Sequence, residues 1–162
     1  MKWSKLKKRV EETFACSIRK RIKIYTTSYR KQDDLSRSWI VIDGKQKISL
    51  SDIASWREQQ AYFHELTPTD CLTHKAVENS SRSEGNLYES GEFSSYDFKI
   101  MAFIYLNTSA HDCIKSTHPI LRGLGALNKR IGIKKIKLLL NDPHPMVAFL
   151  ANYRYQRELA QK

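Results

Sequence analysis

A β-hairpin is predicted by the stretch Trp39-Ile40-Val41-Ile42-Asp43-Gly44-Lys45-Gln46-Lys47-Ile48-Ser49-Leu50. Two alternating runs rich in apolar and β-branched residues flank Asp43-Gly44, and Asp-Gly is a typical two-residue turn between antiparallel strands. Residues 21–29 alternate in the same way and predict a strand before the hairpin. We therefore expect a small antiparallel sheet of about three strands, with Trp39 and Val41 on its buried face.

An amphipathic helix is predicted ahead of this sheet, over residues 3–18. Its apolar face repeats at three- and four-residue steps, through Trp3, Leu6, Val10 and Phe14. We expect this face to share one core with the sheet.

The rest of the chain predicts a single α+β domain of 162 residues. The α+β part covers residues 1–66 and closes with a helix over 53–66. Residues 67–94 hold few apolar anchors and predict a loop-rich excursion. Residues 95–162 form the helical part, which begins with a helix through the apolar run Ile100–Leu106.

Two segments of the helical part begin alike, His118-Pro119-Ile120-Leu121-Arg122 and His144-Pro145-Met146-Val147-Ala148. Proline suits the first turn of a helix, so each segment predicts a helix start. Residues 134–140 are expected to form an antiparallel partner for the second helix. With the Asn141-Asp142-Pro143 turn, this region resembles HEAT-type helical repeats. That resemblance implies two helical hairpins and a surface for binding rather than chemistry.

The chain also resembles a small family of uncharacterised bacterial proteins. The features that carry the resemblance are Met1-Lys2-Trp3-Ser4-Lys5-Leu6-Lys7, Arg37-Ser38-Trp39-Ile40-Val41-Ile42-Asp43-Gly44-Lys45 and the His-Pro-Ile-Leu-Arg segment from His118. It implies a bacterial, cytoplasmic protein and no particular activity.

The charge distribution indicates an anionic partner. The net charge is +11, and residues 1–50 carry 14 basic against 5 acidic residues, residues 51–100 carry 4 against 9, and residues 101–162 carry 10 against 3. Basic ends of this kind favour an acidic protein or nucleic acid, and the HEAT-like surface favours the acidic protein slightly. No apolar run is long enough for a membrane span, so no membrane partner is expected. The candidate binding residues are Lys5, Lys7, Lys8, Arg9, Lys129, Arg130, Lys134, Lys135 and Lys137.

The enzymatic alternative is a metal-dependent nuclease. Asp43 and Lys45 follow an apolar strand with the spacing of a nuclease half-motif, and Asp33 or Asp34 would supply a second Mg²⁺ ligand. A plain hairpin turn explains the same residues, and we expect that reading to hold. Cys71, His74, His111 and Cys113 match no common zinc site. Because the three cysteines form no disulfide framework and no Gly-rich phosphate loop is present, we expect a cytoplasmic protein without enzymatic activity or cofactor.

Overall fold

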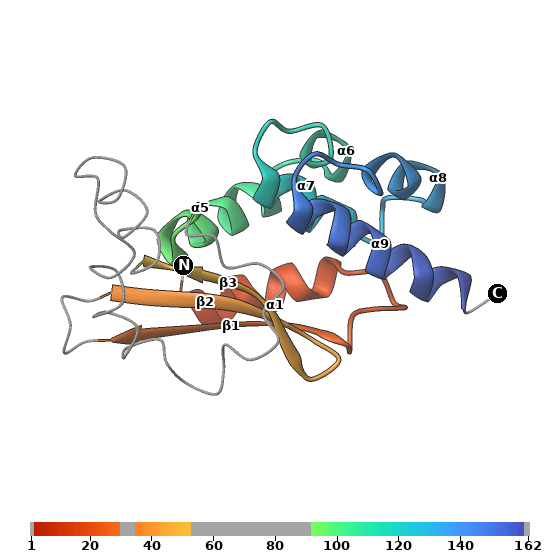
Figure 1. Ribbon diagram of the computed structural model, residues 1–162. Coiled ribbons are helices and arrows are strands. Elements are labelled where there is room, and N and C mark those ends of the chain that lie inside the picture. Colours follow the sequence, from red (N-terminus) through yellow and green to blue (C-terminus); the bar gives the residue numbers. More distant parts are fainter. Residues whose placement is uncertain (1, 30–34, 53–91, 161–162) are drawn as a thin grey trace, which may run out of the picture. The chain divides into compact units, whose positions relative to one another are not determined.

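The computed structural model describes residues 2–29, 35–52 and 92–160, and Figure 1 shows their elements. A helix and a three-stranded sheet are followed by a mainly helical C-terminal half, which confirms the predicted α+β class. The chain divides into two compact units, Met1–Lys23 with Lys99–Lys162, and Ile24–Phe98. The predicted helix over 53–66 and nearly all of the predicted loop over 67–94 lie outside the described residues. The single-domain organisation stays a prediction.

The sheet contains β1 (Ile22–Tyr29), β2 (Leu35–Ile42) and β3 (Lys45–Ser51), in the order β1-β2-β3. The second and third strands pair antiparallel. Asp43 and Gly44 join them with backbone φ angles of 49° and 80°. Two successive residues of positive φ match the type I′ turn whose twist suits a tight hairpin. The predicted hairpin is therefore confirmed.

The prediction that Trp39 and Val41 lie on the buried face of the sheet is wrong, because their neighbours Ile40 and Ile42 are the buried apolar residues of β2. Trp39 and Val41 are only partly buried. Trp39 instead stacks on Tyr25 with ring centroids 5.6 Å apart, and the Arg37 guanidinium carbon lies 5.5 Å from the centroid of the Trp39 ring. Because both faces of β2 carry apolar side chains, alternation alone does not identify the inner one. The apolar residues of the strands that are at most 3 % exposed are Ile22, Ile24, Ile40, Ile42, Ile48 and Leu50.

The first helix, α1 (Trp3–Thr13), ends five residues before its predicted end at residue 18. Phe14 leaves the helix with extended backbone angles, φ −63° and ψ 148°, and forms a β-bridge with Asn128. Phe14 and Ile18 remain buried after the helix has ended. The apolar periodicity of the sequence therefore extends beyond the helix itself. After Thr13, pairing with the segment at Asn128 takes the place of further helical hydrogen bonds.

Both His-Pro segments begin helices, as predicted. His118 and His144 occupy the N-cap positions, and the His118 ring accepts a hydrogen bond from the Ile120 backbone N–H at 3.3 Å. The elements of the C-terminal half are α5 (Ser95–Leu106), α6 (Ala110–Cys113), α7 (Pro119–Leu127), α8 (Ile133–Ile136), the 3-10 helix η1 (Lys137–Leu139) and α9 (Pro145–Leu159).

The predicted antiparallel partner over 134–140 is short, because α8 and η1 supply only four and three residues. Arg122 of the first His-Pro segment contacts the residue two positions before the second one: its guanidinium lies 2.8 and 2.9 Å from the two carboxylate oxygens of Asp142. Burial alone would raise the pKa of Asp142, but the Arg122 and His144 hydrogen bonds outweigh it and hold that pKa below its ordinary value. The resemblance to HEAT repeats stays a prediction.

Candidate anion-binding pocket

Two distant basic segments of the sequence meet directly after α1. The Ala15 backbone N–H donates to the Leu127 carbonyl at 2.9 Å, and the Lys129 N–H donates to the Thr13 carbonyl at 2.8 Å. These two bonds flank the β-bridge between Phe14 and Asn128 and fix the chain after α1 beside the chain after α7. The two segments that carry predicted binding residues therefore lie side by side.

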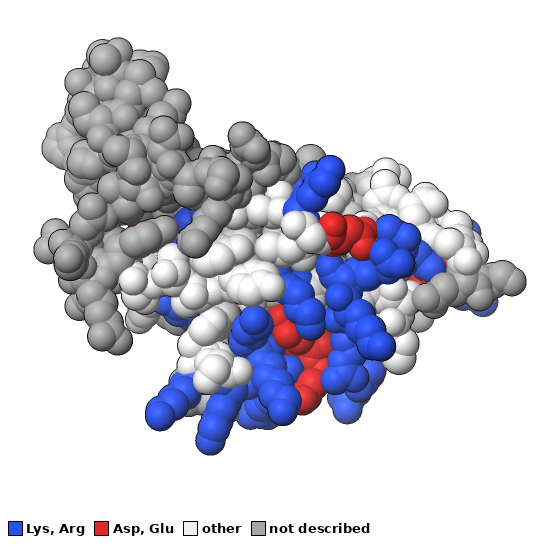
Figure 2. Space-filling model, turned by 90° about the horizontal axis from the view of Figure 1, so that it is seen from below, with Lys and Arg blue, Asp and Glu red and all other residues white. Residues whose placement is uncertain are grey.

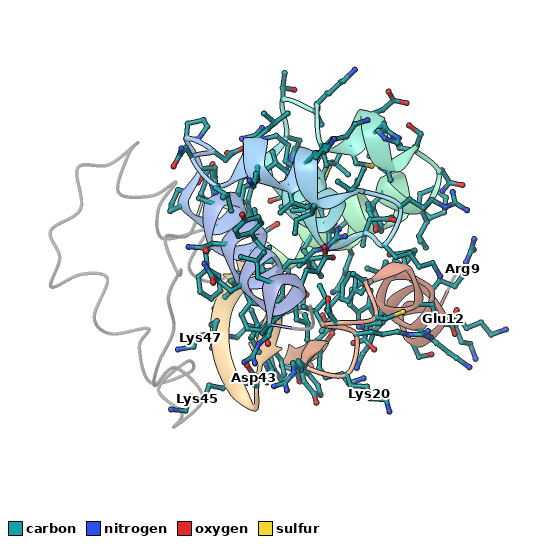
Figure 3. The ribbon with its side chains drawn as sticks, turned by 90° about the vertical axis from the view of Figure 1, so that its right-hand side faces the viewer. Arg9, Glu12, Lys20, Asp43, Lys45 and Lys47 are labelled. Carbon is teal, nitrogen blue, oxygen red and sulfur yellow. The ribbon has the colours of Figure 1, made fainter. Side chains whose placement is uncertain are left out.

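The meeting of these segments forms a cavity of about 310 Å³, referred to here as the pocket. Three of the predicted binding residues line it: Arg9 from α1, and Lys129 and Arg130 from the loop after α7. All three are exposed side chains. Glu12 lies one helical turn after Arg9 and lines the same pocket, and Figure 3 shows where these two residues extend from α1. Lys129 is anchored by a hydrogen bond of 3.2 Å from its ammonium group to the Glu12 carbonyl.

A chain of hydrogen bonds forms the buried side of the pocket. The Asn128 amide donates to the Tyr105 hydroxyl at 2.6 Å, and that hydroxyl lies 2.6 Å from Thr13 Oγ1. Because the Thr13 hydroxyl donates its only proton to the Val10 carbonyl at 2.7 Å, Tyr105 must be the donor to Thr13. Both hydroxyl protons in this chain are therefore used, and the network joins α5, α1 and the loop after α7.

The environment of Tyr105 keeps its hydroxyl neutral. Burial raises the pKa of Tyr105 from 10.0 to about 12, although the hydrogen bonds with Thr13 and Asn128 oppose the shift. The Asn128 side-chain carbonyl oxygen also accepts a bond of 2.9 Å from the Arg130 backbone N–H. The pocket therefore combines a neutral, hydrogen-bonded wall with three cations and one carboxylate.

A buried arginine holds the loop that carries Lys129 and Arg130. Arg154, on α9, is only 2 % exposed and donates to the carbonyls of Ala126, Asn128 and Ile131 at 2.6–2.8 Å. Its Nε also donates to Glu158 at 2.7 Å. Arg154 is not among the predicted binding residues, and its buried position gives it a structural role. No local sequence motif predicts that role, because the carbonyls that Arg154 binds lie 23 to 28 residues before it in the sequence.

The other predicted binding residues do not line this pocket. Lys5 and Lys8 are exposed on α1, and Lys7 forms an ion pair with Glu11 at 3.8 Å. Three exposed lysines form a second cationic surface on α8 and η1, and one of them, Lys137, lies 5.8 Å from the centroid of the Tyr155 ring. These three are Lys134, Lys135 and Lys137.

Asp43, the central residue of the nuclease alternative, lies in the tight turn of the hairpin. Asp43 is exposed at the hairpin, with Lys45 next to the turn (Figure 3). Asp33 and Asp34, and with them Cys71 and His74, lie outside the described residues. Within the described ranges, no three His, Cys, Asp or Glu side chains are grouped so that they could hold a metal ion. The nuclease alternative itself stays untested.

Comparison with known proteins shows which family the chain belongs to. A family model matches residues 2–155, which include every pocket residue. The chain belongs to the SF0329 protein family. The predicted resemblance to a small uncharacterised family is thereby confirmed, while a bacterial origin stays a prediction. No curated protein and no solved structure matches this SF0329 family member. Among its described helices, none has the length and apolar character that crossing a membrane requires.

Proposed function

We propose that this SF0329 family member is a non-enzymatic binding protein, and that α1 and the pocket bind an acidic segment of a partner protein. The observation that carries the proposal is the convergence of Arg9, Lys129 and Arg130 on one cavity. Backbone hydrogen bonds and the buried Arg154 fix the backbone that carries Lys129 and Arg130 beside α1, so less backbone ordering is needed when a ligand binds.

The mixture of charges on this surface supports a protein rather than a nucleic acid. Glu11 and Glu12 lie among the cations of α1 and the pocket, and Figure 2 shows a face of the molecule on which carboxylates are interspersed with Lys and Arg. A continuous phosphate backbone would meet these carboxylates, whereas separate acidic side chains can be placed between them. The aromatic ring among the described pocket residues, Tyr105, is 2 % exposed, which leaves it unsuited to stacking on a base.

A cytoplasmic location is part of the same proposal. Cys16 and Cys113 are free thiols, and Cys113 is buried. Burial raises the pKa of Cys113 to about 11, so this thiol stays protonated and unreactive at neutral pH. Free thiols are the usual state in a reducing compartment.

The test compares two triple variants of equal charge. The pocket variant carries Arg9→Gln, Lys129→Gln and Arg130→Gln, and the control carries Lys134→Gln, Lys135→Gln and Lys137→Gln. Fluorescence anisotropy would measure the Kd of both variants for an acidic peptide and for single-stranded RNA of equal charge. Three exposed charges in contact with a ligand support a loss of about tenfold or more in peptide affinity for the pocket variant. The control should lose roughly threefold or less, because only the long-range field is reduced.

Two outcomes would contradict the proposal. If the RNA binds more tightly than the peptide, with a steep salt dependence that the pocket variant flattens, the partner is a nucleic acid. If both variants weaken peptide binding equally, the net charge is responsible and the pocket has no part in it.

A further inference from the structure

The charge of the pocket matches a doubly charged anion better than a single carboxylate. Arg9, Lys129 and Arg130 supply three positive charges and Glu12 one negative charge, which leaves a net charge of two positive on the lining side chains. A phosphate monoester carries about −1.5 to −2 at neutral pH, whereas an Asp or Glu side chain carries one negative charge. A carboxylate would leave a net positive charge in the pocket, and a phosphate monoester would neutralise it.

The type and placement of the donors point the same way. Two of the three cations are guanidinium groups, whose planar N–H donors match two oxygens of one phosphate. They come from two different segments, Arg9 from α1 and Arg130 from the loop after α7. The backbone of Arg130 is held by its bond to Asn128, and the pocket wall at Tyr105 is neutral. The hydroxyl on that wall therefore adds no negative charge that would oppose an anion.

The volume of the pocket limits how much of the ligand beyond its phosphate group can bind inside it. A volume of about 310 Å³ lies at the low end of the range for small-molecule sites. It accommodates a phosphate group together with a short part of the chain that carries it.

We infer that the pocket binds a phosphate monoester, and that its source is a phosphorylated side chain in the acidic partner segment. The second half of this inference rests on the proposed function. The first half does not, because a small phosphorylated molecule presents the same chemistry to the same cations. The experiment must therefore separate the two sources.

Titration calorimetry on the full chain would use four probes. Two are acidic peptides of one sequence, with and without phosphoserine at the central position, and the others are phosphoserine and inorganic phosphate. The variants are Arg9→Gln with Arg130→Gln, and the control Lys134→Gln with Lys135→Gln, which removes the same charge from α8. Circular dichroism would verify that both variants fold.

We expect the phosphorylated peptide to bind about tenfold more tightly than its unmodified form, as an added pair of charge-assisted hydrogen bonds supports. The Arg9/Arg130 variant should lose that preference, and the Lys134/Lys135 control should keep it. Phosphoserine and inorganic phosphate should bind far more weakly than the peptide. If they bind as tightly as the peptide and lose affinity in the Arg9/Arg130 variant, the phosphate site stands and its source is a small molecule.

The inference fails if the two peptides bind equally and phosphoserine gives no heat of binding. In that case the proposed function survives, since the unmodified acidic peptide still binds. It also fails if the control loses the phosphate preference as much as the pocket variant does. If the unmodified peptide does not bind but the free phosphates do, the proposed function is overturned while the phosphate site remains.

Discussion

Single side chains build the pocket from the inside. Arg154 satisfies three backbone carbonyls at the end of α7 and in the loop after it, and Tyr105 joins three segments through one hydroxyl. Neither side chain is a candidate for binding the anion. They fix the backbone next to Lys129 and Arg130, so that both residues line the same pocket as Arg9.

The substitution Arg154→Gln should lower the free energy of unfolding by about 3–5 kcal/mol. The shorter side chain leaves buried carbonyls unpaired and Glu158 without its partner, and breaking a buried charged network costs this much. Urea unfolding followed by circular dichroism would measure the change. The matched control is Arg157→Gln on the same helix, where the guanidinium lies over the Tyr153 ring and an effect of about 0.5–1 kcal/mol is expected. Equal effects at the two positions would mean that the carbonyl contacts of Arg154 are not important for stability.

The substitution Tyr105→Phe should alter the dependence of stability on alkaline pH. The Tyr105 hydroxyl ionises at an ordinary pKa of 10.0 in the unfolded chain and at about 12 in the folded one. The unfolded state therefore loses its proton first, so the free energy of unfolding falls as the pH rises from 10 to 12. Two pKa units correspond to about 2.7 kcal/mol.

A phenylalanine ring has no proton to lose, so this part of the pH dependence should disappear in the Tyr105→Phe variant. At neutral pH the variant should also be less stable, by about 1–2 kcal/mol, because Asn128 and Thr13 lose their partner. Cys113 contributes a similar decline as its pKa rises from 9.0 to about 11, and the variant retains that decline. Urea unfolding at a series of pH values would measure both effects. Parallel curves for the two proteins above pH 10 would show that Tyr105 is more accessible to solvent than the fold indicates.

Elements that depend on local sequence were predictable, and elements that depend on distant contacts were not. The hairpin at Asp43-Gly44 and both His-Pro helix starts follow from residues next to one another in the chain. The end of α1 does not, because Phe14 leaves the helix to pair with Asn128. The pocket shows the same division: charge identified Arg9, Lys129 and Arg130, but only the fold reveals that they converge. Arg154 and Tyr105 gave no signal in the sequence, since their partners come from other elements.

Close packing between α6 and α7 makes Gly125 a position where a methyl group should destabilise the fold. A Cβ atom there would lie 2.8 Å from the Ile114 side chain and 3.2 Å from its backbone nitrogen. Overpacking typically costs about 1–3 kcal/mol, and alanine regains up to ~1 kcal/mol in helix propensity. We therefore expect Gly125→Ala to destabilise the fold by about 1–2 kcal/mol.

Thermal unfolding would measure the effect of Gly125→Ala. The matched control is Gly132→Ala, because a Cβ at Gly132 meets nothing within 4 Å and its backbone φ of −75° suits any residue. The control should stay within about 0.5 kcal/mol of the parent. A parent-like Gly125→Ala would show that α6 can move away from α7 at little cost.

At the scale of the whole molecule, the charge pattern could be predicted from the sequence, whereas the division into two compact units could not. The basic ends of the sequence were predictable from composition, and the α+β class from the order of its patterns. The division into units was not, because one unit combines Met1–Lys23 with Lys99–Lys162 and the other occupies the sequence between them. Composition has no information on which distant segments join. Residues 1–23 of the first basic end and the whole of the last basic end belong to one compact unit, and this explains how Arg9, Lys129 and Arg130 come to share a pocket.

The backbone bonds between residues 13–15 and 127–129 have a consequence for synthesis on the ribosome. Domains form from the N-terminus as the chain emerges, at about 5–20 residues per second, so Arg9 precedes Arg130 by on the order of 10 s. During that interval Thr13 and Ala15 lack their partners at Lys129 and Leu127, and water must occupy their polar groups. The loop gains its full support only when Arg154 has also been added. A translation product that stops short of this residue carries the cations of α1 without the hydrogen bonds from Arg154 that hold the loop. We therefore expect the proposed anion binding only in chains translated past Arg154.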